Sequence, residues 1–140
     1  MHHDPLFCPL HLGQLHLANR IVMPPMTRSR ASQPGDVANA MMATYYAQRA
    51  GAGLIISEGT QIDPLGKVYA WTPGIHSAEQ VAGWKQVTDA VHAEGGIMFA
   101  QLWHVGRVTH PGNIGGAQPL SSSAIQAKGC LLYTSDACRR

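Results

Sequence analysis

Three short apolar runs, separated by stretches with helical spacing, constrain the fold of this chain more than any other feature. The runs are residues 21–28, 53–60 and 96–104, and each begins with aliphatic residues and ends in polar or aromatic ones. The order β-α-β-α-β predicts right-handed crossovers and a parallel sheet. In a (β/α) barrel, ligands are held at the rim where strands pass into loops. The pattern therefore predicts a ligand-binding rim.

Alternation and short apolar stretches predict the strands. Residues 10–17 alternate apolar and polar side chains around Gly13 and Gln14, which indicates a hairpin. The strands predicted for the parallel sheet are residues 21–26, 54–57 and 97–102. The middle strand is apolar on both faces, as a covered parallel sheet requires.

The first predicted helix lies between the first two strands of this sheet. It begins at Asp36 or Asn39, either of which could cap it, and continues to Ala50 with Gly51 as its stop. Its residues at helical spacing are Met41, Met42, Tyr45 and Tyr46.

The second predicted helix opens with a capping box. In this motif the Ser77 hydroxyl and the Gln80 amide satisfy free backbone N–H groups reciprocally. The helix ends near Gly95 and Gly96. Its predicted apolar stripe consists of Val81, Trp84, Val87 and Val91.

Three βα units do not complete a barrel. An eight-stranded barrel typically needs about 250 residues, whereas this chain has 140. An open three-stranded parallel sheet would leave both edges unpaired. A doubly wound sheet is the structural competitor, but no G-x-G-x-x-G motif follows the first strand.

Composition excludes several function classes. Hydrophobic residues at 45% and charged residues at 13% describe a globular interior, and a net charge of +2 without a Lys/Arg-rich run argues against nucleic-acid binding. No apolar stretch approaches the roughly 20 residues that cross a bilayer. The N-terminus lacks the basic start and apolar core of a signal peptide. We therefore expect a cytoplasmic protein with neither a nucleic-acid nor a membrane partner.

The polar and aromatic residues at the strand ends suit a flat heteroaromatic ligand. Gln101 and Trp103 share one face of their strand by alternation, and a carboxamide matches a ring edge that alternates C=O and N–H. Thr27 can donate one hydrogen bond, Pro25 stiffens the backbone, and Gly59 lets the main chain approach a ring. A buried glutamine at a strand end is, however, more often a paired core amide.

Four longer strings closely resemble the old yellow enzyme family. They are N-R-I-V-M-P-P-M-T-R-S-R-A, Y-Y-A-Q-R-A-G-A-G-L-I-I-S-E-G-T-Q-I, T-P-G-I-H-S-A-E-Q-V-A-G-W-K and Q-L-W-H-V-G-R-V-T-H-P. Members of this family are flavin-dependent ene-reductases built on a (β/α)8 barrel. The resemblance extends from about Leu6 to about Lys128. It implies an incomplete (β/α)8 TIM barrel, in which residues 1–128 form the N-terminal part of the flavin-binding domain, with a hairpin and about three βα units.

The resemblance also implies roles for individual residues. The cofactor-binding residues that it implies are Pro24, Pro25, Met26, Thr27, Gly59 and Gln101. The Thr27 hydroxyl would lie near flavin O4 and tune the reduction potential, and Thr27 is the one residue with an implied catalytic effect. The Gly59 backbone would touch the flavin, and Gln101 would pair with its pyrimidine edge. Tyr69 and Trp103 would lie on the substrate side.

The implied reaction uses FMN and a nicotinamide. NADPH, or NADH, reduces the flavin, which then delivers hydride from N5 to an alkene conjugated to a carbonyl or nitro group, as in enones, nitroalkenes and maleimides. In the family, the residues that grip and protonate the substrate come from later strands, so we expect the chain as given to be inactive. The alternative is a naturally short, non-catalytic protein, either a flavin-binding half-barrel or a partner subunit. The sequence predicts no oligomeric state.

Four other polar residues receive structural interpretations. His104 and His110 are expected to anchor loops, and no third ligand at suitable spacing supports a metal site. Glu58 is expected to be a hydrogen-bonding residue of the barrel interior, with acid–base catalysis as the minor alternative. Arg107 is expected to hold loop carbonyls, with contact to a partner as the alternative.

The last residues, 129–140, depart abruptly from the family. They look like the translation of a sequencing adapter joined to a genuine reading frame, and we expect them to be a non-native tail. The alternative is a divergent natural tail. Two of the three cysteines, Cys130 and Cys138, lie in this segment, and with Cys8 they follow no disulfide or zinc spacing.

Overall fold

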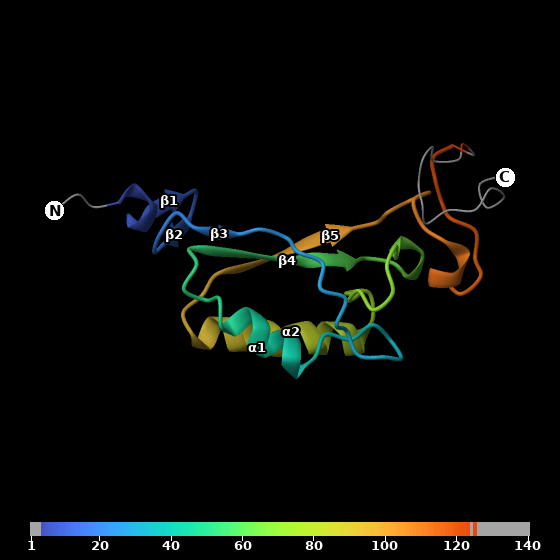
Figure 1. Cartoon of the computed structure of the whole chain (residues 1–140), viewed down its shortest axis with the longest axis horizontal. Coiled ribbons are helices and arrows are strands. Elements are labelled where there is room, and N and C mark those ends of the chain that lie inside the picture. The colour runs from blue at the N-terminus through green and yellow to red at the C-terminus, as the bar shows by residue number, and fades with distance from the viewer. Residues whose placement is uncertain (1–3, 124, 126–140) are drawn as a thin grey trace.

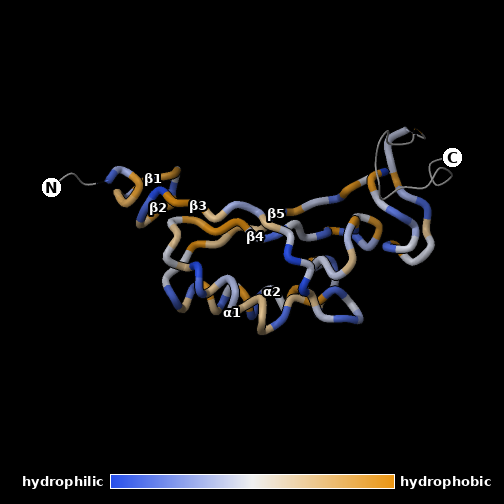
Figure 2. The backbone as a smooth tube through the Cα atoms, in the orientation of Figure 1, coloured by the Kyte–Doolittle hydropathy of each residue, from blue (hydrophilic) through white to orange (hydrophobic). Residues whose placement is uncertain are grey.

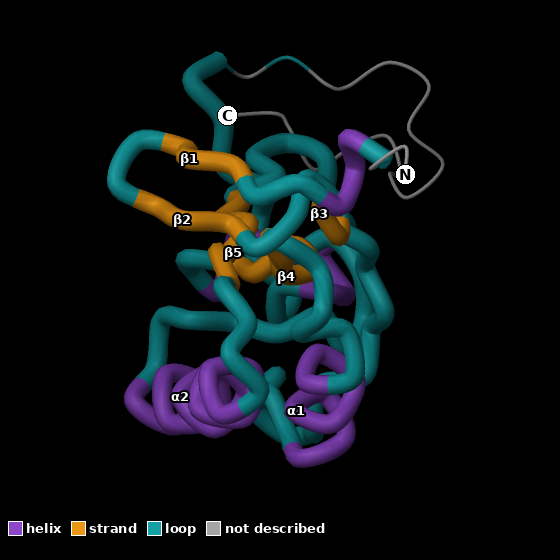
Figure 3. Tube along the Cα trace, turned by 90° about the vertical axis from the view of Figure 1, so that its left-hand side faces the viewer, coloured by secondary structure: helices purple, strands orange, loops and turns teal. Residues whose placement is uncertain are grey.

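The computed structural model describes residues 4–123 and residue 125, so the predicted tail at 129–140 lies outside the described residues. A short 3-10 helix, η1 (Pro5–Phe7), precedes a hairpin of β1 (Leu10–Leu12) and β2 (Leu15–Leu17). The two strands pair antiparallel with Leu10 opposite Leu17, which confirms the predicted hairpin. Figure 3 shows the hairpin on the side of the parallel sheet away from the helices.

Three parallel strands and two helices form the main body. The sheet has the order β3-β4-β5, with β3 (Val22–Met23), β4 (Leu54–Gln61) and β5 (Met98–Trp103). The connections contain α1 (Ala40–Ala47) and α2 (Ala78–Ala93), and both helices cover the same face of the sheet (Figure 1). Two further 3-10 helices, η2 (Pro64–Gly66) and η3 (Pro111–Asn113), lie in the loops after β4 and β5. The predicted β-α-β-α-β order in a parallel sheet is confirmed.

The strand lengths differ from the prediction. The first was predicted to reach Met26, but β3 ends at Met23, because Pro24 and Pro25 have no N–H with which to continue the ladder. In contrast, β4 continues past Ser57 to Gln61, since β5 pairs with it over that length.

The helix starts follow their side-chain caps. Asn39, not Asp36, caps α1, and its side-chain oxygen accepts the N–H of Met42. The helix ends at Ala47, so Gly51 lies in the turn beyond it rather than at its stop. In α2 the predicted capping box is confirmed, because Gln80 N–H donates to Ser77 Oγ (3.2 Å) and Ser77 N–H to Gln80 Oε1 (3.1 Å).

The hydrophobic core lies between the sheet and the two helices. It includes Met23, Met42, Ala43, Tyr46, Ile55, Trp84, Val87 and Val91. The predicted stripe on α2 is wrong at Val81, which is 51% exposed. At about 100° per residue, Val81 projects roughly 100° away from the centre of the buried face. Met41 of α1 is also exposed, at 65%.

The face of the sheet away from the helices is largely uncovered in the described part of the chain. Met23, Ile55 and Met98 are aligned across the strands and face the helices, so their neighbours Val22 and Phe99 point the other way. Val22 is 44% exposed and Phe99 47% exposed. Each strand begins with hydrophobic residues, and β4 becomes hydrophilic toward its end (Figure 2). We call this surface, defined by Val22 and Phe99, the open face.

Candidate functional site

The carboxyl ends of the three parallel strands bring the sequence-predicted residues Thr27, Gly59 and Gln101 together. Gly59 on β4 is the register partner of Gln101 on β5. Thr27 lies in the segment that follows β3, and its neighbour Arg28 is hydrogen-bonded to Glu58, the residue before Gly59. Gly59 and Gln101 therefore lie on neighbouring strands, and Thr27 lies in the segment beyond β3, at one end of the sheet.

A β-bulge in β4 sets this pairing. The register passes from Ile56 opposite Phe99 to Gly59 opposite Gln101, so β4 has one more residue than β5 between these pairs. The hydroxyl of Ser57, within the bulge, accepts the backbone N–H of Gln101 (3.0 Å). Nothing in the apolar pattern of β4 indicated this extra residue.

Gly59, Trp103 and Tyr69 form an aromatic corner beside this pairing. A Cβ on Gly59 would lie 2.4 Å from carbons of the Trp103 ring, so the indole packs directly on the Gly59 backbone. Residue 59 must therefore be glycine to make room for the Trp103 ring of the chain itself, and the sequence pattern did not indicate this contact. The ring centroids of Tyr69 and Trp103 are 6.5 Å apart. The Trp103 Nε1 atom is buried and has no hydrogen-bond partner in the part of the chain that the structure describes.

The remaining side chains at this rim are available to a ligand. Gln101 and Thr27 are exposed, and neither uses its side chain in a hydrogen bond to another described residue. The interpretation of Gln101 as a paired core amide is therefore wrong. Pro24 and Met26 are exposed and Pro25 is half-buried. The rim offers an exposed hydroxyl and an exposed carboxamide beside flat apolar surfaces, which suits a planar heteroaromatic ring.

Glu58 is a buried carboxylate directly behind this rim. It is 1% exposed, and its Oε2 accepts the backbone N–H groups of Arg28 (3.1 Å) and Ser29 (3.2 Å). The Tyr46 hydroxyl, from α1, donates to Oε1 (3.4 Å) and accepts the Glu58 N–H (2.8 Å). The predicted hydrogen-bonding role is confirmed, but the side chain lies against α1 and not in the barrel interior.

Burial controls the ionisation of this pair. Desolvation raises the pKa of the Glu58 carboxyl, and the two backbone N–H groups oppose that rise. Desolvation also raises the pKa of the Tyr46 hydroxyl. Tyr46 therefore stays protonated at neutral pH and can act as a hydrogen-bond donor to Glu58.

The two histidines and Arg107 hold loops, as predicted. The Gly106 N–H donates to Nδ1 of His104 (3.1 Å), and the Gly112 N–H donates to Nδ1 of His110 (3.0 Å). Arg107 donates to the Ile125 carbonyl (2.6 Å) and to Ser123 Oγ (3.1 Å).

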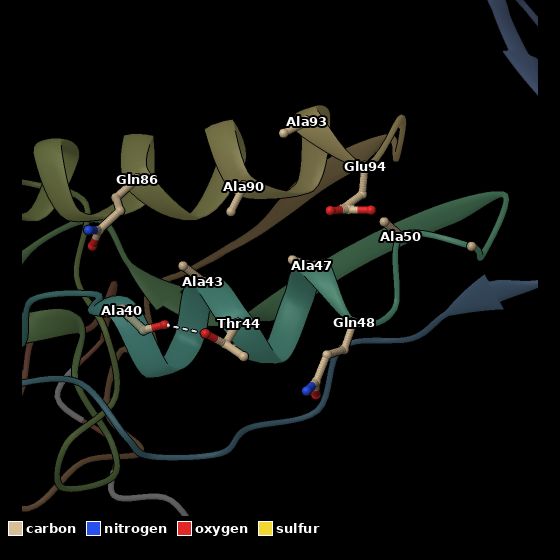
Figure 4. Close-up of a pocket in the computed structure, with 11 residues that line it drawn as sticks. Ala40, Ala43, Thr44, Ala47, Gln48, Ala50, Gln86, Ala90, Ala93 and Glu94 are labelled. Atoms are coloured by element: carbon tan, nitrogen blue, oxygen red, sulfur yellow. Dashed lines mark hydrogen bonds between the residues drawn. The ribbon is translucent and has the colours of Figure 1, made fainter.

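A wide groove of about 970 Å³ lies elsewhere, between α1 and α2. Figure 4 shows that Ala43 and Ala47 face this groove from α1, and Ala90 and Ala93 from α2. The groove is also lined by Thr44, Gln48, Gln86 and Glu94, but by none of the sequence-predicted site residues, so the rim remains the candidate site. Across the described residues no three or more His, Cys, Asp or Glu side chains cluster as a metal site, and no helix there could cross a membrane.

Comparison with known proteins gives one consistent result. The family model for the NADH:flavin oxidoreductase / NADH oxidase family matches residues 5–130. The chain is 50% identical over 121 residues to 12-oxophytodienoate reductase 7 of Oryza sativa subsp. japonica, covering 85% of this chain and 30% of that protein. Morphinone reductase in complex with tetrahydroNAD is 51% identical with a TM-score of 0.85, covering 91% of this chain and 35% of that one. An old yellow enzyme homologue from Zymomonas mobilis is 48% identical with a TM-score of 0.84, over 90% of this chain and 35% of that one. The chain thus spans about a third of the length of these relatives.

Proposed function

The chain belongs to the NADH:flavin oxidoreductase / NADH oxidase family, and we propose that it supplies the N-terminal part of an FMN-dependent NAD(P)H:alkene oxidoreductase. The resemblance to old yellow enzymes is confirmed by the match to a solved homologue of that name. The proposed substrates are small alkenes activated by a carbonyl or nitro group, including enones, nitroalkenes and maleimides. A cytoplasmic location and a domain boundary near residue 128 belong to the same proposal.

The residues at the rim fit a bound flavin. The unpaired carboxamide of Gln101 and hydroxyl of Thr27 match the carbonyl and N–H groups of an isoalloxazine edge, and the buried Trp103 N–H needs an acceptor. Pro24, Pro25, Met26 and Gly59 would line the ring. When bound, FMN supplies the hydride chemistry between a nicotinamide and an alkene. NADPH or NADH is the proposed reductant, supported by the morphinone reductase complex with tetrahydroNAD.

The contribution of this chain is orientation and electrostatics. Thr27 would donate a hydrogen bond at flavin O4, and Gln101 would pair with the pyrimidine edge. Both contacts favour negative charge on the ring, by the same principle as an oxyanion hole. Tyr69 and Trp103 would present aromatic surfaces to the substrate and keep water from it.

The observation that carries this proposal is the alignment of Gly59 with Gln101 beside the Thr27 segment, in a chain that belongs to a flavin oxidoreductase family. Its test is a chimera in which residues 5–130 replace the matching third of morphinone reductase. We expect a yellow protein that binds FMN and reduces a maleimide with a nicotinamide donor. Morphinone reductase itself is the control. A folded chimera that binds no FMN would contradict the proposal.

A further inference from the structure

Glu58 holds the backbone that immediately follows Thr27. Its Oε2 accepts the N–H groups of both Arg28 and Ser29, at 3.1 and 3.2 Å. The Arg28 N–H belongs to the same planar peptide group as the Thr27 carbonyl. Holding that N–H therefore restricts the ψ rotation at Thr27 and limits the directions in which its side chain can leave the rim.

Packing alone would not hold this segment. Thr27 and Arg28 are exposed, and the segment borders a pocket of about 180 Å³ whose wall includes Arg30, Tyr45 and Glu58. Ser29 also has a φ of +52°, a left-handed conformation that few residues other than glycine adopt. A strained, exposed backbone next to open space needs an anchor, and the Glu58 carboxylate provides two bonds to it.

The anchor is itself fixed from the helix layer. Tyr46 is 1% exposed in the core and is hydrogen-bonded to Glu58 through both the carboxylate and the backbone N–H. The chain of contacts thus runs from α1 through Tyr46 and Glu58 to the segment that carries Thr27. Each carboxylate oxygen accepts a hydrogen bond from the chain itself and the side chain is 1% exposed, which favours a structural role over proton exchange with a ligand at the rim.

We propose that Glu58 is a positioning residue, which fixes the Thr27 segment in place before any flavin binds and thereby directs the Thr27 hydroxyl at the ring. The inference rests on the proposed function for its effect on the flavin. The preorganisation itself is a property of the chain and can be tested without the cofactor.

The first test measures hydrogen–deuterium exchange of residues 26–30 in the full-length protein without FMN. Glu58→Gln keeps one oxygen that can accept both N–H groups, whereas Glu58→Met keeps the length of the side chain and removes every acceptor. We expect exchange of the Arg28 and Ser29 amides to be unchanged in Glu58→Gln and to accelerate at least tenfold in Glu58→Met. The control is Glu94→Gln at the exposed end of α2. Equal exchange in the wild type and Glu58→Met would overturn the proposal.

The second test measures the flavin midpoint potential in the same variants. Glu58→Met should shift the potential by as much as Thr27→Ala does, and the double variant should show no further shift. Glu58→Gln should stay close to the wild type. Additive shifts in the double variant would overturn the positioning role, since the two residues would then act independently.

The two tests separate this inference from the proposed function. A wild-type protein that binds no FMN, yet shows faster exchange in Glu58→Met, would refute the flavin enzyme and uphold the anchor. If the protein binds FMN and its midpoint potential changes in Thr27→Ala but not in Glu58→Met, the flavin enzyme is upheld and the positioning role of Glu58 is refuted.

Discussion

At the scale of single residues, Gln101 is the rim side chain with the most hydrogen-bonding capacity and no partner among the described residues. Gln101→Ala should weaken FMN binding, because the ring-edge groups would be left unpaired at a cost of about 1–3 kcal/mol, or about 5- to 150-fold in affinity. Fluorescence titration of the full-length apoprotein with FMN measures this. Gln86→Ala, at an exposed position on α2, is the matched control. Unchanged affinity in Gln101→Ala would place the pyrimidine edge elsewhere.

Thr27 should affect reactivity more than binding. Thr27→Ala removes the one hydroxyl proposed at flavin O4, so the reduced ring loses stabilisation and its reduction by the nicotinamide slows. Stopped-flow reduction and a potentiometric titration measure the two effects, and Thr27→Ser should restore both. If the midpoint potential of Thr27→Ala equals that of the wild type, the hydroxyl does not tune the flavin.

Glu58 gives the folded protein a pH dependence of defined sign. Because burial raises its pKa above the ordinary value of 4.5, the folded state favours the neutral carboxyl. The contribution of Glu58 to stability is therefore fully present below the ordinary pKa and is lost as pH rises through the raised one. Thermal unfolding of the full-length protein and Glu58→Gln, compared between about pH 4 and pH 8, should show the wild type losing stability relative to the variant as pH increases. A constant difference between the two would contradict this assignment.

At the scale of elements, the close approach of α2 to the segment before α1 depends on Gly83. A Cβ at Gly83 would lie 2.4 Å from the Ala38 carbonyl oxygen. Alanine favours a helix over glycine by about 1 kcal/mol, but overpacking against backbone costs about 1–3 kcal/mol. Gly83→Ala should therefore lower the melting temperature. Gly51→Ala, where a Cβ would meet nothing within 4 Å, should leave it unchanged or raise it, and a stabilised Gly83→Ala would refute the contact.

Local signals in the sequence predicted the elements well where one residue decides the conformation. The Ser77–Gln80 capping box and the hairpin turn at Gly13 depend only on neighbours in the chain. The end of β3 differs from the prediction because the apolar run continues past Met23, whereas Pro24 and Pro25 lack the N–H groups that would extend the ladder. The bulge in β4 could not be predicted, since it depends on how two strands about forty residues apart come into register.

At the scale of the whole molecule, the open face and both sheet edges dominate the behaviour of the isolated 140-residue chain. Phe99 and Leu102 are 47% and 58% exposed on the edge strand β5. Exposed apolar surface next to unpaired strand edges favours aggregation or a molten state. We expect the chain alone to bind the dye ANS, to give poorly dispersed amide NMR spectra and to reduce no alkene. Sharp, dispersed spectra from a monomer would show that it folds alone.

The sequence predicted which residues form the candidate site, but it did not predict the contacts that hold them in place. Thr27, Gly59 and Gln101 could be grouped because parallel strands end at one edge, whatever their exact register. Strict alternation would put Thr27 on the side of Met23, which faces the helices, whereas Gln101 shares the side of Phe99, which faces away from them. Alternation alone therefore could not place Thr27 beside Gln101. The link from Glu58 to Tyr46 joins the sheet to a helix, and no periodicity in one segment reveals such a contact.

Ser57 and Glu58 together occupy the bulge in β4, where a single residue would complete a regular ladder. The rim therefore depends on the length of β4 at this point, which the composition of the strand does not reveal. Deleting either Ser57 or Glu58 would restore an unbroken ladder with β5, and the strand would still read as apolar and well paired. Gly59 would still lie opposite Gln101, but the deletion would remove either the Ser57 hydroxyl that accepts the Gln101 N–H or the Glu58 carboxylate that accepts the Arg28 and Ser29 N–H groups. A one-residue gap at this point in any distant homologue would therefore mark a protein with a differently built rim.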